Sequence, residues 1–341
     1  MRSDLTRRFI PSLALISVLS CLLLSSSLEP NKAYAKKKKK TTEISEEYYD
    51  MLVLGVDRRA YQSTGRSDVM MIIHCEPGKI TFFSIPRDTL TLVKGKYDKI
   101  NHSFAYGGAR LTKATVERFL KFKVDNYIVV DFQTFLTTIE VIKKLTDDGR
   151  LIGAENFLAS GIDLLKWLRF RSLPKGDRRR CQRHQLFMKR VFEYTQDMFV
   201  GQPLMFGQCM KAGLKIVDTD LTYEHAEQLF DKYKAIDLEV SLERYVLPGY
   251  GTSRYRKSPA ITRKRYESKH MPNFNAIVSG EGLEGEEAAA RKKQLIKKWH
   301  RKHTLISYYI PKYRWSLDTY IKWFRKNGMQ MNYVEVDTLR K

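Results

Sequence analysis

The alternation of apolar, strand-like runs with amphipathic helical segments is the feature that most restricts the fold of this chain. Residues 48–56 have a strand-like pattern, residues 127–130 are a short apolar run, and a Pro-Gly turn joins two further runs at 69–75 and 80–85. Residues 110–122 and 132–145 instead repeat apolar side chains at helical spacing. Strands that alternate with helices in this way predict an α/β sandwich, in which helices flank a central mixed β-sheet.

The same reading continues to residue 248. It predicts a short helix at 160–168, a longer helix at 180–199, a helix at 222–234 and a final strand at 242–247. We therefore place one α/β domain at residues 42–248.

The composition changes after residue 248. Residues 249–300 are rich in glycine, serine, lysine and arginine, which predicts a long loop or linker, with a helix at its end over 286–300. Residues 305–310, 316–327 and 329–336 then predict a small β-α-β unit. Residues 249–341 are thus interpreted as a basic C-terminal extension. The sequence leaves open whether this extension binds an anionic envelope surface or extends the core sheet.

The positive charge lies mainly at the two ends of the chain. The formal net charge is +23, and residues 249–341 hold 21 basic against eight acidic side chains, while residues 1–41 hold nine against two. The middle of the chain is therefore nearly neutral. A basic balance over the whole chain would suggest nucleic acid, but here basic ends flank a nearly neutral core, and no helix-turn-helix or RNA-binding signature is present. We expect no nucleic-acid partner.

The N-terminus has the features of an export segment. Arg2, Arg7 and Arg8 precede an uncharged run at 9–28, which is about long enough to span a bilayer. Residues 33–35 then match the small-x-small pattern of a cleavage site. Residues 1–41 are interpreted as a signal peptide or signal anchor followed by a basic linker, so the rest of the chain is expected outside the cytoplasmic membrane.

Clusters of arginine and aspartate recur between residues 55 and 185. They are GVDRR (55–59), GRSD (65–68), SIPRD (84–88), DKIN (98–101), RFR (169–171) and DRRRCQRHQ (177–185). The guanidinium fork donates two parallel hydrogen bonds to phosphate oxygens. Aspartates beside such arginines suit a hard cation that shares its coordination with substrate phosphates. The clusters therefore predict a site for a multiply charged phosphate ester.

The order and spacing of these motifs resemble the LytR-CpsA-Psr (LCP) family of cell-envelope enzymes, over about residues 48–248. The resemblance implies a membrane-associated phosphotransferase that takes a glycan from a polyprenyl-pyrophosphate carrier. The acceptor would be a sugar hydroxyl of peptidoglycan or of another envelope polymer. The product would be a phosphodiester, with polyprenyl phosphate as the leaving group. The resemblance also favours a retained anchor over a cleaved signal peptide.

Each candidate residue has an expected role within these motifs. Asp57 and Asp68 are the candidates for contact with Mg²⁺ or Mn²⁺. The candidate catalytic residues have two expected roles. A phosphate clamp would consist of Arg87, Arg169, Arg171 and Arg180. The base for the acceptor hydroxyl would be Asp177. The candidate substrate-binding residues are Arg59, Arg66, Lys99, His184 and Gln185. Asp88 is expected to orient Arg87.

Some features leave alternatives open. His184 stands where family members carry a glutamine, and imidazole differs from an amide because it can also protonate. An apolar set could line a pocket for the lipid or could be ordinary core packing: Val116, Phe119, Leu120, Phe132, Phe135 and Ile139. The same cation and clamp would also suit an exported polyprenyl-pyrophosphate hydrolase. A non-catalytic envelope regulator or binding protein is the alternative from a different class.

Overall fold

The structure of this chain is a computed structural model. It describes residues 48–57, 65–131, 161–170, 176–199, 203–266 and 304–328, together with a few isolated positions such as Phe135. The expected export segment lies outside the described residues, as do most of the helices expected at 132–145 and 286–300 and the strand expected at 329–336. None of the helices described for this chain combines the length and apolar character that crossing a bilayer requires.

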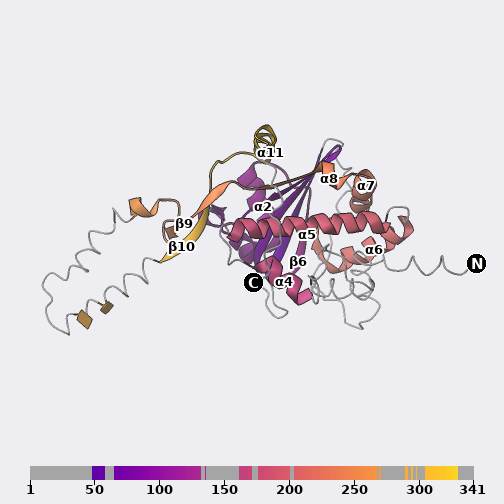
Figure 1. Cartoon of the computed structure of the whole chain (residues 1–341). Helices are drawn as coiled ribbons and strands as arrows, with labels where there is room; N and C mark the ends of the chain where they lie inside the picture. The colour runs from indigo at the N-terminus through magenta and orange to yellow at the C-terminus, as the bar shows by residue number, and fades with distance from the viewer. Residues whose placement is uncertain are drawn as a thin grey trace, which may run out of the picture.

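A six-stranded mixed sheet forms the centre of the molecule (Figure 1). Its order is β7-β6-β1-β2-β3-β8. The strands are β1 (Tyr49–Asp57), β2 (Arg66–Glu76), β3 (Lys79–Ser84), β6 (Asn126–Asp131), β7 (Asp218–Thr219) and β8 (Leu242–Val246). The pairs β1–β6 and β3–β8 are parallel, and the other pairs are antiparallel. The prediction of an α/β fold with a central mixed sheet is confirmed.

Helices cover both faces of this sheet. One face packs against α2 (His102–Leu120) and α11 (Leu317–Lys326), and the other against α5 (Gly176–Phe199), α6 (Pro203–Ile216), α7 (Tyr223–Tyr233) and α8 (Leu238–Ser241). A further helix, α4 (Gly161–Arg169), contacts α5. Alternate strand residues point to opposite faces. Leu52 accordingly belongs to the core under α2, while Val53 belongs to the core under α5.

The locally encoded elements agree with the sequence. The hairpin between β2 and β3 turns at Pro77-Gly78, where Gly78 has φ +72°, a conformation that favours glycine at this turn position. Helix α7 begins after Thr222, whose hydroxyl accepts a hydrogen bond from the backbone nitrogen of His225. Capping and turn chemistry act over a few residues, so a single sequence is enough to reveal them.

Of the apolar residues considered for a lipid pocket, Phe132 and Ile139 lie outside the described residues, and the others are not gathered in one place. Val116 and Leu120 are fully buried in the core under α2. Phe135 instead contacts Phe187 of α5, the helix on the opposite face, with ring centroids 5.5 Å apart. The two groups are on different faces, so core packing accounts for Val116 and Leu120.

Two strand pairs differ from the sequence expectation. The hairpin of β4 (Leu90–Val93) and β5 (Lys96–Lys99) was not anticipated, because its turn places a lysine, Lys94, at φ +48°. Strand β9 (Gly249–Tyr255) lies where a loop was expected, and that part of the expectation was wrong. It pairs antiparallel with β10 (Leu305–Pro311), which lies about fifty residues later in the chain. Pairing with a distant strand overrides the weak strand propensity of a glycine- and serine-rich segment.

Part of the basic C-terminal region belongs to the main core. Leu317, Tyr320, Ile321 and Phe324 of α11 are buried in the same cluster as the central strands. The ring of Phe324 stacks on Tyr245 of β8 at 4.4 Å. A division of the chain at residue 249 therefore does not separate two cores. Strands β9 and β10 form a separate two-stranded sheet, so the described part of this region does not extend the central sheet, but the packing of α11 makes it part of the core.

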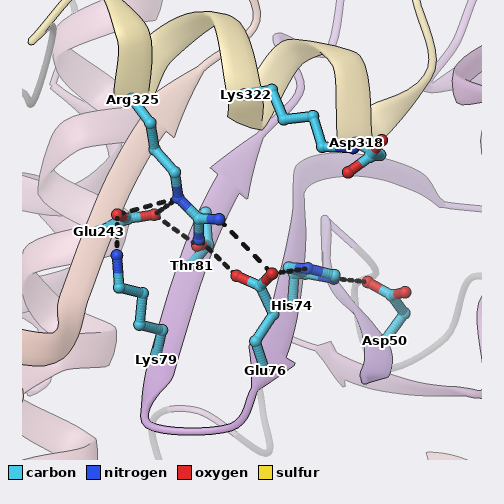
Figure 2. A network of polar contacts seen from close by, with 9 residues as sticks. All are labelled: Asp50, His74, Glu76, Lys79, Thr81, Glu243, Asp318, Lys322 and Arg325. Carbon is cyan, nitrogen blue, oxygen red and sulfur yellow. Dashed lines mark hydrogen bonds and ion pairs between the residues drawn. The ribbon is translucent and has the colours of Figure 1, made fainter. Parts of the chain in front are cut away.

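A polar network fixes the C-terminal end of α11 to the sheet (Figure 2). The Nε atom of Arg325 donates to Glu243 of β8 at 2.8 Å, and its Nη2 atom donates to Glu76 of β2. Glu76 lies 3.8 Å from His74, which in turn contacts Asp50 of β1 at 2.9 Å. The network thus joins α11 to strands β1, β2 and β8 at the edge where β1 begins.

Candidate active site

A β-bulge at Asp68 shapes the opposite edge of the sheet, where β1 ends. Gly55 pairs with Val69 and Val56 pairs with Ser67, so Asp68 is the extra residue of β2 in this register. An extra residue of this kind bends the strand and re-aims its side chain. A Cβ atom on Gly55 would lie 2.8 Å from the Cβ of Val69, so only glycine allows this close approach. The GVDRR and GRSD motifs together place Asp68 here.

Arginines from two other motifs converge on Asp68. Nη1 of Arg87, which follows β3, lies 2.5 Å from Oδ2 of Asp68. Nη2 of Arg180, on α5, donates to the backbone oxygen of Asp68 at 3.3 Å. The Arg180 side chain is 3 % exposed and lies 3.5 Å from Asp177 in the first turn of the same helix. Residues far apart in the sequence thus form one charged cluster around the bulge.

The DKIN motif joins the cluster through the loop after β3. Oδ1 of Asp88 lies 3.0 Å from Nζ of Lys99 and 3.9 Å from Nε of Arg87. The backbone nitrogen of Asn101 donates to the oxygen of Arg87 at 3.2 Å. Asp88 therefore stands between Arg87 and Lys99, where its charge can orient both side chains.

Helix α4 brings Arg169 to the end of β1. Its Nη2 atom lies 3.5 Å from Oδ2 of Asp57, and both side chains are exposed. Arg183 of α5 holds the end of α4, because its guanidinium donates to the backbone oxygen of Phe170 and lies over the ring of Trp167. Arg183 therefore positions Arg169 through the α4–α5 contact.

His184 lies beside this contact as a neutral imidazole. Burial and the charges of Arg180 and Arg183 lower the pKa of His184 to about 3, against the effect of a hydrogen bond with the backbone of Leu168. At physiological pH His184 therefore adds no positive charge to the site. In this respect it is equivalent to the neutral glutamine that family members carry at the same position.

Gln185 points away from the charged cluster. It is 1 % exposed, and its amide nitrogen donates to Oγ of Ser84 at 2.8 Å and to the backbone oxygen of Tyr245 at 2.7 Å. These contacts fix α5 to β3 and β8. The geometry therefore gives Gln185 a positioning role, whereas the sequence had placed it among the substrate-binding residues.

The remaining candidates are less closely joined to the cluster. Arg66 is exposed at the first position of β2, directly opposite Asp57 of β1. Arg59 and Arg171 lie outside the described residues.

Several buried polar atoms of the cluster lack partners within the described part of the chain. They are Nε of Arg87, Nε of Arg180, Nε of Arg183, Oγ of Ser67 and Oδ1 of Asn101. A buried donor without an acceptor costs free energy, so such groups usually mark a ligand or water position. Arg87 and Arg180 both contact Asp68, and each keeps a donor that the described residues do not satisfy. Ser67 and Asn101 were not singled out from the sequence, although they lie inside the GRSD and DKIN motifs; only their burial distinguishes them.

The acidic residues suit a shared metal ion rather than a closed metal cage. Asp57 is the last residue of β1, and Asp68 is the bulge residue of the neighbouring strand β2. No group of three or more histidine, cysteine or acidic side chains suited to a metal occurs in the described ranges. Mg²⁺ is commonly held by one or two carboxylates together with substrate phosphates and water. Two carboxylates on adjacent strands are the kind of donor set that such a shared site uses.

Comparison with known proteins agrees with this arrangement of motifs. The LytR_cpsA_psr family profile matches residues 19–149. The chain is 30 % identical over 233 residues to the polyisoprenyl-teichoic acid–peptidoglycan teichoic acid transferase TagU of Bacillus subtilis. The aligned region covers 64 % of this chain and 74 % of that protein. It is 32 % identical over 214 residues to TagU of Bacillus anthracis, and this aligned region covers 59 % of the chain and 69 % of that relative. The chain belongs to the LytR-CpsA-Psr family.

Solved structures resemble this family member in fold. TagV of Bacillus subtilis has a TM-score of 0.51 and 19 % identity, over 63 % of this chain and 89 % of TagV. The Lin1025 protein of Listeria innocua has a TM-score of 0.52 and 18 % identity, over 82 % of this chain and 98 % of Lin1025. At these identities the likeness supports the α/β architecture alone.

Proposed function

We propose that this LytR-CpsA-Psr protein transfers a glycan from a polyprenyl-pyrophosphate carrier to a sugar hydroxyl of peptidoglycan or a similar envelope polymer. The observation that carries the proposal is the cluster around the bulge, in which Arg87 and Arg180 flank Asp68 with unpaired, buried guanidinium donors. The proposal is supported by the relatives at 30–32 % identity, which are named as transferases of polyisoprenyl-linked teichoic acid to peptidoglycan.

The reaction is the displacement of polyprenyl phosphate by a sugar hydroxyl at the phosphorus that carries the glycan. The acceptor oxygen attacks the phosphorus that carries the glycan, and the bond from this phosphorus to the bridging pyrophosphate oxygen breaks. Polyprenyl phosphate leaves with the electron pair of that bond, and the glycan remains on the acceptor through a phosphodiester. Such a reaction depends mainly on positioning and on neutralising the charge of the phosphates.

The arginines supply that neutralisation. Arg87 and Arg180 bind phosphate oxygens from the two sides of Asp68, and Arg169 approaches from α4 at the end of β1. Arg59, Arg66 and Arg171 complete the proposed clamp by their places in the motifs. Lys99 adds a point charge next to Asp88.

Asp57 and Asp68 would hold Mg²⁺ or Mn²⁺. When bound, this ion would neutralise pyrophosphate charge as the leaving group departs. Both carboxylates contact arginines, Arg169 and Arg87, so cation and clamp would meet on the same phosphates. Asp177 is the proposed acceptor of the hydroxyl proton, since its half-exposed carboxylate stands beside Arg180.

The location of the reaction follows from the N-terminal segment. We propose that residues 1–41 anchor the protein and place the catalytic domain outside the cytoplasmic membrane, where the lipid carrier and the wall polymer are both accessible.

The test is product analysis with the full-length chain. A soluble short-chain polyprenyl-pyrophosphate disaccharide and a peptidoglycan acceptor should yield an acceptor that carries the disaccharide through a phosphodiester, detected by mass spectrometry. Disaccharide phosphate released without such a product would instead indicate a hydrolase. Absence of donor turnover would refute both.

The metal is tested in the same assay. Excess chelator should abolish turnover, and Asp68→Asn should raise the Mg²⁺ concentration needed for half-maximal rate. Full activity of metal-free protein in chelator would exclude the role of Asp57 and Asp68 as metal ligands.

A further inference from the structure

An exposed tyrosine is held rigidly beside the charged cluster. Tyr106 of α2 is 49 % exposed, yet its hydroxyl donates to Oδ2 of Asp98 at 2.8 Å. Its ring meets that of His102 edge-on, with centroids 6.0 Å apart. Nδ1 of His102 lies 2.9 Å from Oδ1 of the same Asp98. We call Tyr106, Asp98 and His102 the tyrosine platform.

The backbone after Tyr106 explains its exposure. Gly107 and Gly108 interrupt α2 with non-helical dihedral angles, and Gly108 has φ +62°. A Cβ atom on Gly107 would lie 2.8 Å from the Cβ of Leu111. The break ends the first turn of the helix at Tyr106, and Nζ of Lys94 donates to the Tyr106 backbone oxygen at 2.8 Å. The ring is therefore presented to solvent by a fixed backbone.

The tyrosine platform adjoins the proposed phosphate site. The backbone nitrogen of Lys99 donates to Asp98 at 2.8 Å, while Nζ of Lys99 lies 3.0 Å from Asp88. Lys99 also lies over the ring of Tyr308 on β10, 5.7 Å from its centroid. One residue, Lys99, thus connects the tyrosine platform to the loop that carries Arg87.

The C-terminal ribbon of β9 and β10 closes this side of the site. The backbone nitrogen of Tyr309 donates to the oxygen of Asp88 at 2.8 Å. Arg256, exposed just after β9, is close enough for its charge to act on both Tyr106 and Tyr308. The platform therefore has aromatic surroundings, in which Lys99 and Arg256 are the basic side chains and Asp88 and Asp98 are the acidic ones.

We propose that the tyrosine platform is a sugar subsite, on which a ring of a glycan substrate stacks beside the phosphate clamp. A flat aromatic ring packs against the C–H face of a sugar, and an aromatic side chain already fixed by hydrogen bonds loses little entropy on binding. The charges of Lys99 and Arg256 suit carboxylate or phosphate groups on the same glycan. This inference rests on the proposed function, which brings a glycan to this edge of the sheet.

Two ligands distinguish the glycan that occupies the subsite. Calorimetric titration of the full-length chain uses a soluble peptidoglycan tetrasaccharide as acceptor and a short-chain polyprenyl-pyrophosphate disaccharide as donor. Tyr106→Ala should weaken the binding of at least one ligand about tenfold, since aromatic anchors carry much of the affinity of a binding site. A loss of affinity for the tetrasaccharide alone assigns the subsite to the acceptor, and a loss of affinity for the disaccharide alone assigns it to the donor.

Tyr48→Ala is the matched control. Tyr48 is 47 % exposed, and its ring lies 6.2 Å from that of His74, but it precedes β1 at the opposite edge of the sheet. This variant should bind both ligands like the wild-type chain. Tyr106→Leu keeps apolar bulk without the flat ring, so it should show the same loss as Tyr106→Ala while preserving the fold.

The inference is overturned if Tyr106→Leu, with an unchanged melting temperature, binds both ligands within about twofold of the wild type, a difference too small for a lost aromatic anchor. It is also overturned if the wild type binds neither ligand. Because titration needs no turnover, failure of the subsite is separable from failure of the proposed function. If the wild type transfers glycan but substitution of Tyr106 leaves the affinity for both ligands unchanged, the proposed function stands and the subsite is refuted.

Discussion

Arg325→Ala should destabilise the whole domain, although Arg325 lies in the basic C-terminal region. The guanidinium joins Glu243 of β8 and Glu76 of β2 to α11. Glu243 is 7 % exposed, and without Arg325 it keeps the hydroxyl of Thr81 at 3.1 Å and Nζ of Lys79 at 3.4 Å. The Lys79 side chain is half exposed, so it compensates poorly for a buried carboxylate.

The magnitude follows from this burial. Removal of one partner from a fully buried ion pair costs about 3–5 kcal/mol. Arg325 and Glu76 are 28 % and 30 % exposed, so solvent reaches part of the network. We therefore expect a loss of about 2–3 kcal/mol in the free energy of unfolding, below the value for a fully buried pair. For a domain of this size, that corresponds to a decrease of about 5–10 °C in melting temperature.

The same helix offers the control. Lys322 pairs with Asp318 at 2.9 Å, and both side chains are about 70 % exposed (Figure 2). Lys322→Ala should therefore change the free energy of unfolding by less than about 0.5 kcal/mol. Urea unfolding of the full-length chain, followed by circular dichroism, measures both variants. Glu243→Gln in the Arg325→Ala background should restore about 1 kcal/mol, because it removes the buried charge that lost its partner. Equal stabilities of Arg325→Ala and Lys322→Ala would refute this account of the network.

Three further predictions concern the site, the pH dependence of stability and the C-terminal region. Arg87→Ala should lower turnover on the order of 10³-fold, whereas the exposed Arg178→Ala should do little; equal losses in steady-state assays would contradict the proposed clamp. Burial alone would lower the pKa of His74, but Asp50 and Glu76 raise it above its usual value of 6.5. Protonated His74 therefore stabilises the fold at low pH, and this contribution is lost as the pH rises past about 6.5. His74→Gln should flatten the decline in unfolding free energy between about pH 6 and 8, and an unchanged slope would exclude this histidine as its source. A chain ending at Tyr250 should lose its cooperative thermal transition, because the core loses α11; a retained sharp transition would show that α11 is dispensable.

The sequence by itself determined the local elements and the chemistry of the site. Period-two and helical patterns are set by which residues must face the core, so β1, β2, β3, β6 and α5 follow from the sequence. The arginine and aspartate motifs are short, and their residue types alone indicate phosphate and a divalent cation. The order of the motifs was enough to indicate the family.

The tertiary structure decided how those motifs meet. Asp68 is aimed by a bulge that depends on the register between β1 and β2, and register is a property of the paired strands. Gln185 shares a motif with Arg180, yet the Gln185 side chain is bonded to the sheet and the Arg180 side chain to the cluster, because positions five residues apart on a helix face different neighbours.

The C-terminal region shows most clearly how contacts between distant segments limit what the sequence predicts. From composition, residues 249–341 read as a basic extension, since charge and glycine dominate the segment. In the fold, β9 becomes a strand because β10 pairs with it, and α11 becomes part of the core because its apolar face meets Tyr245 and the sheet. Both outcomes depend on contacts between distant segments. Local pattern identifies the apolar face of α11, and only the folded chain determines which surface covers it.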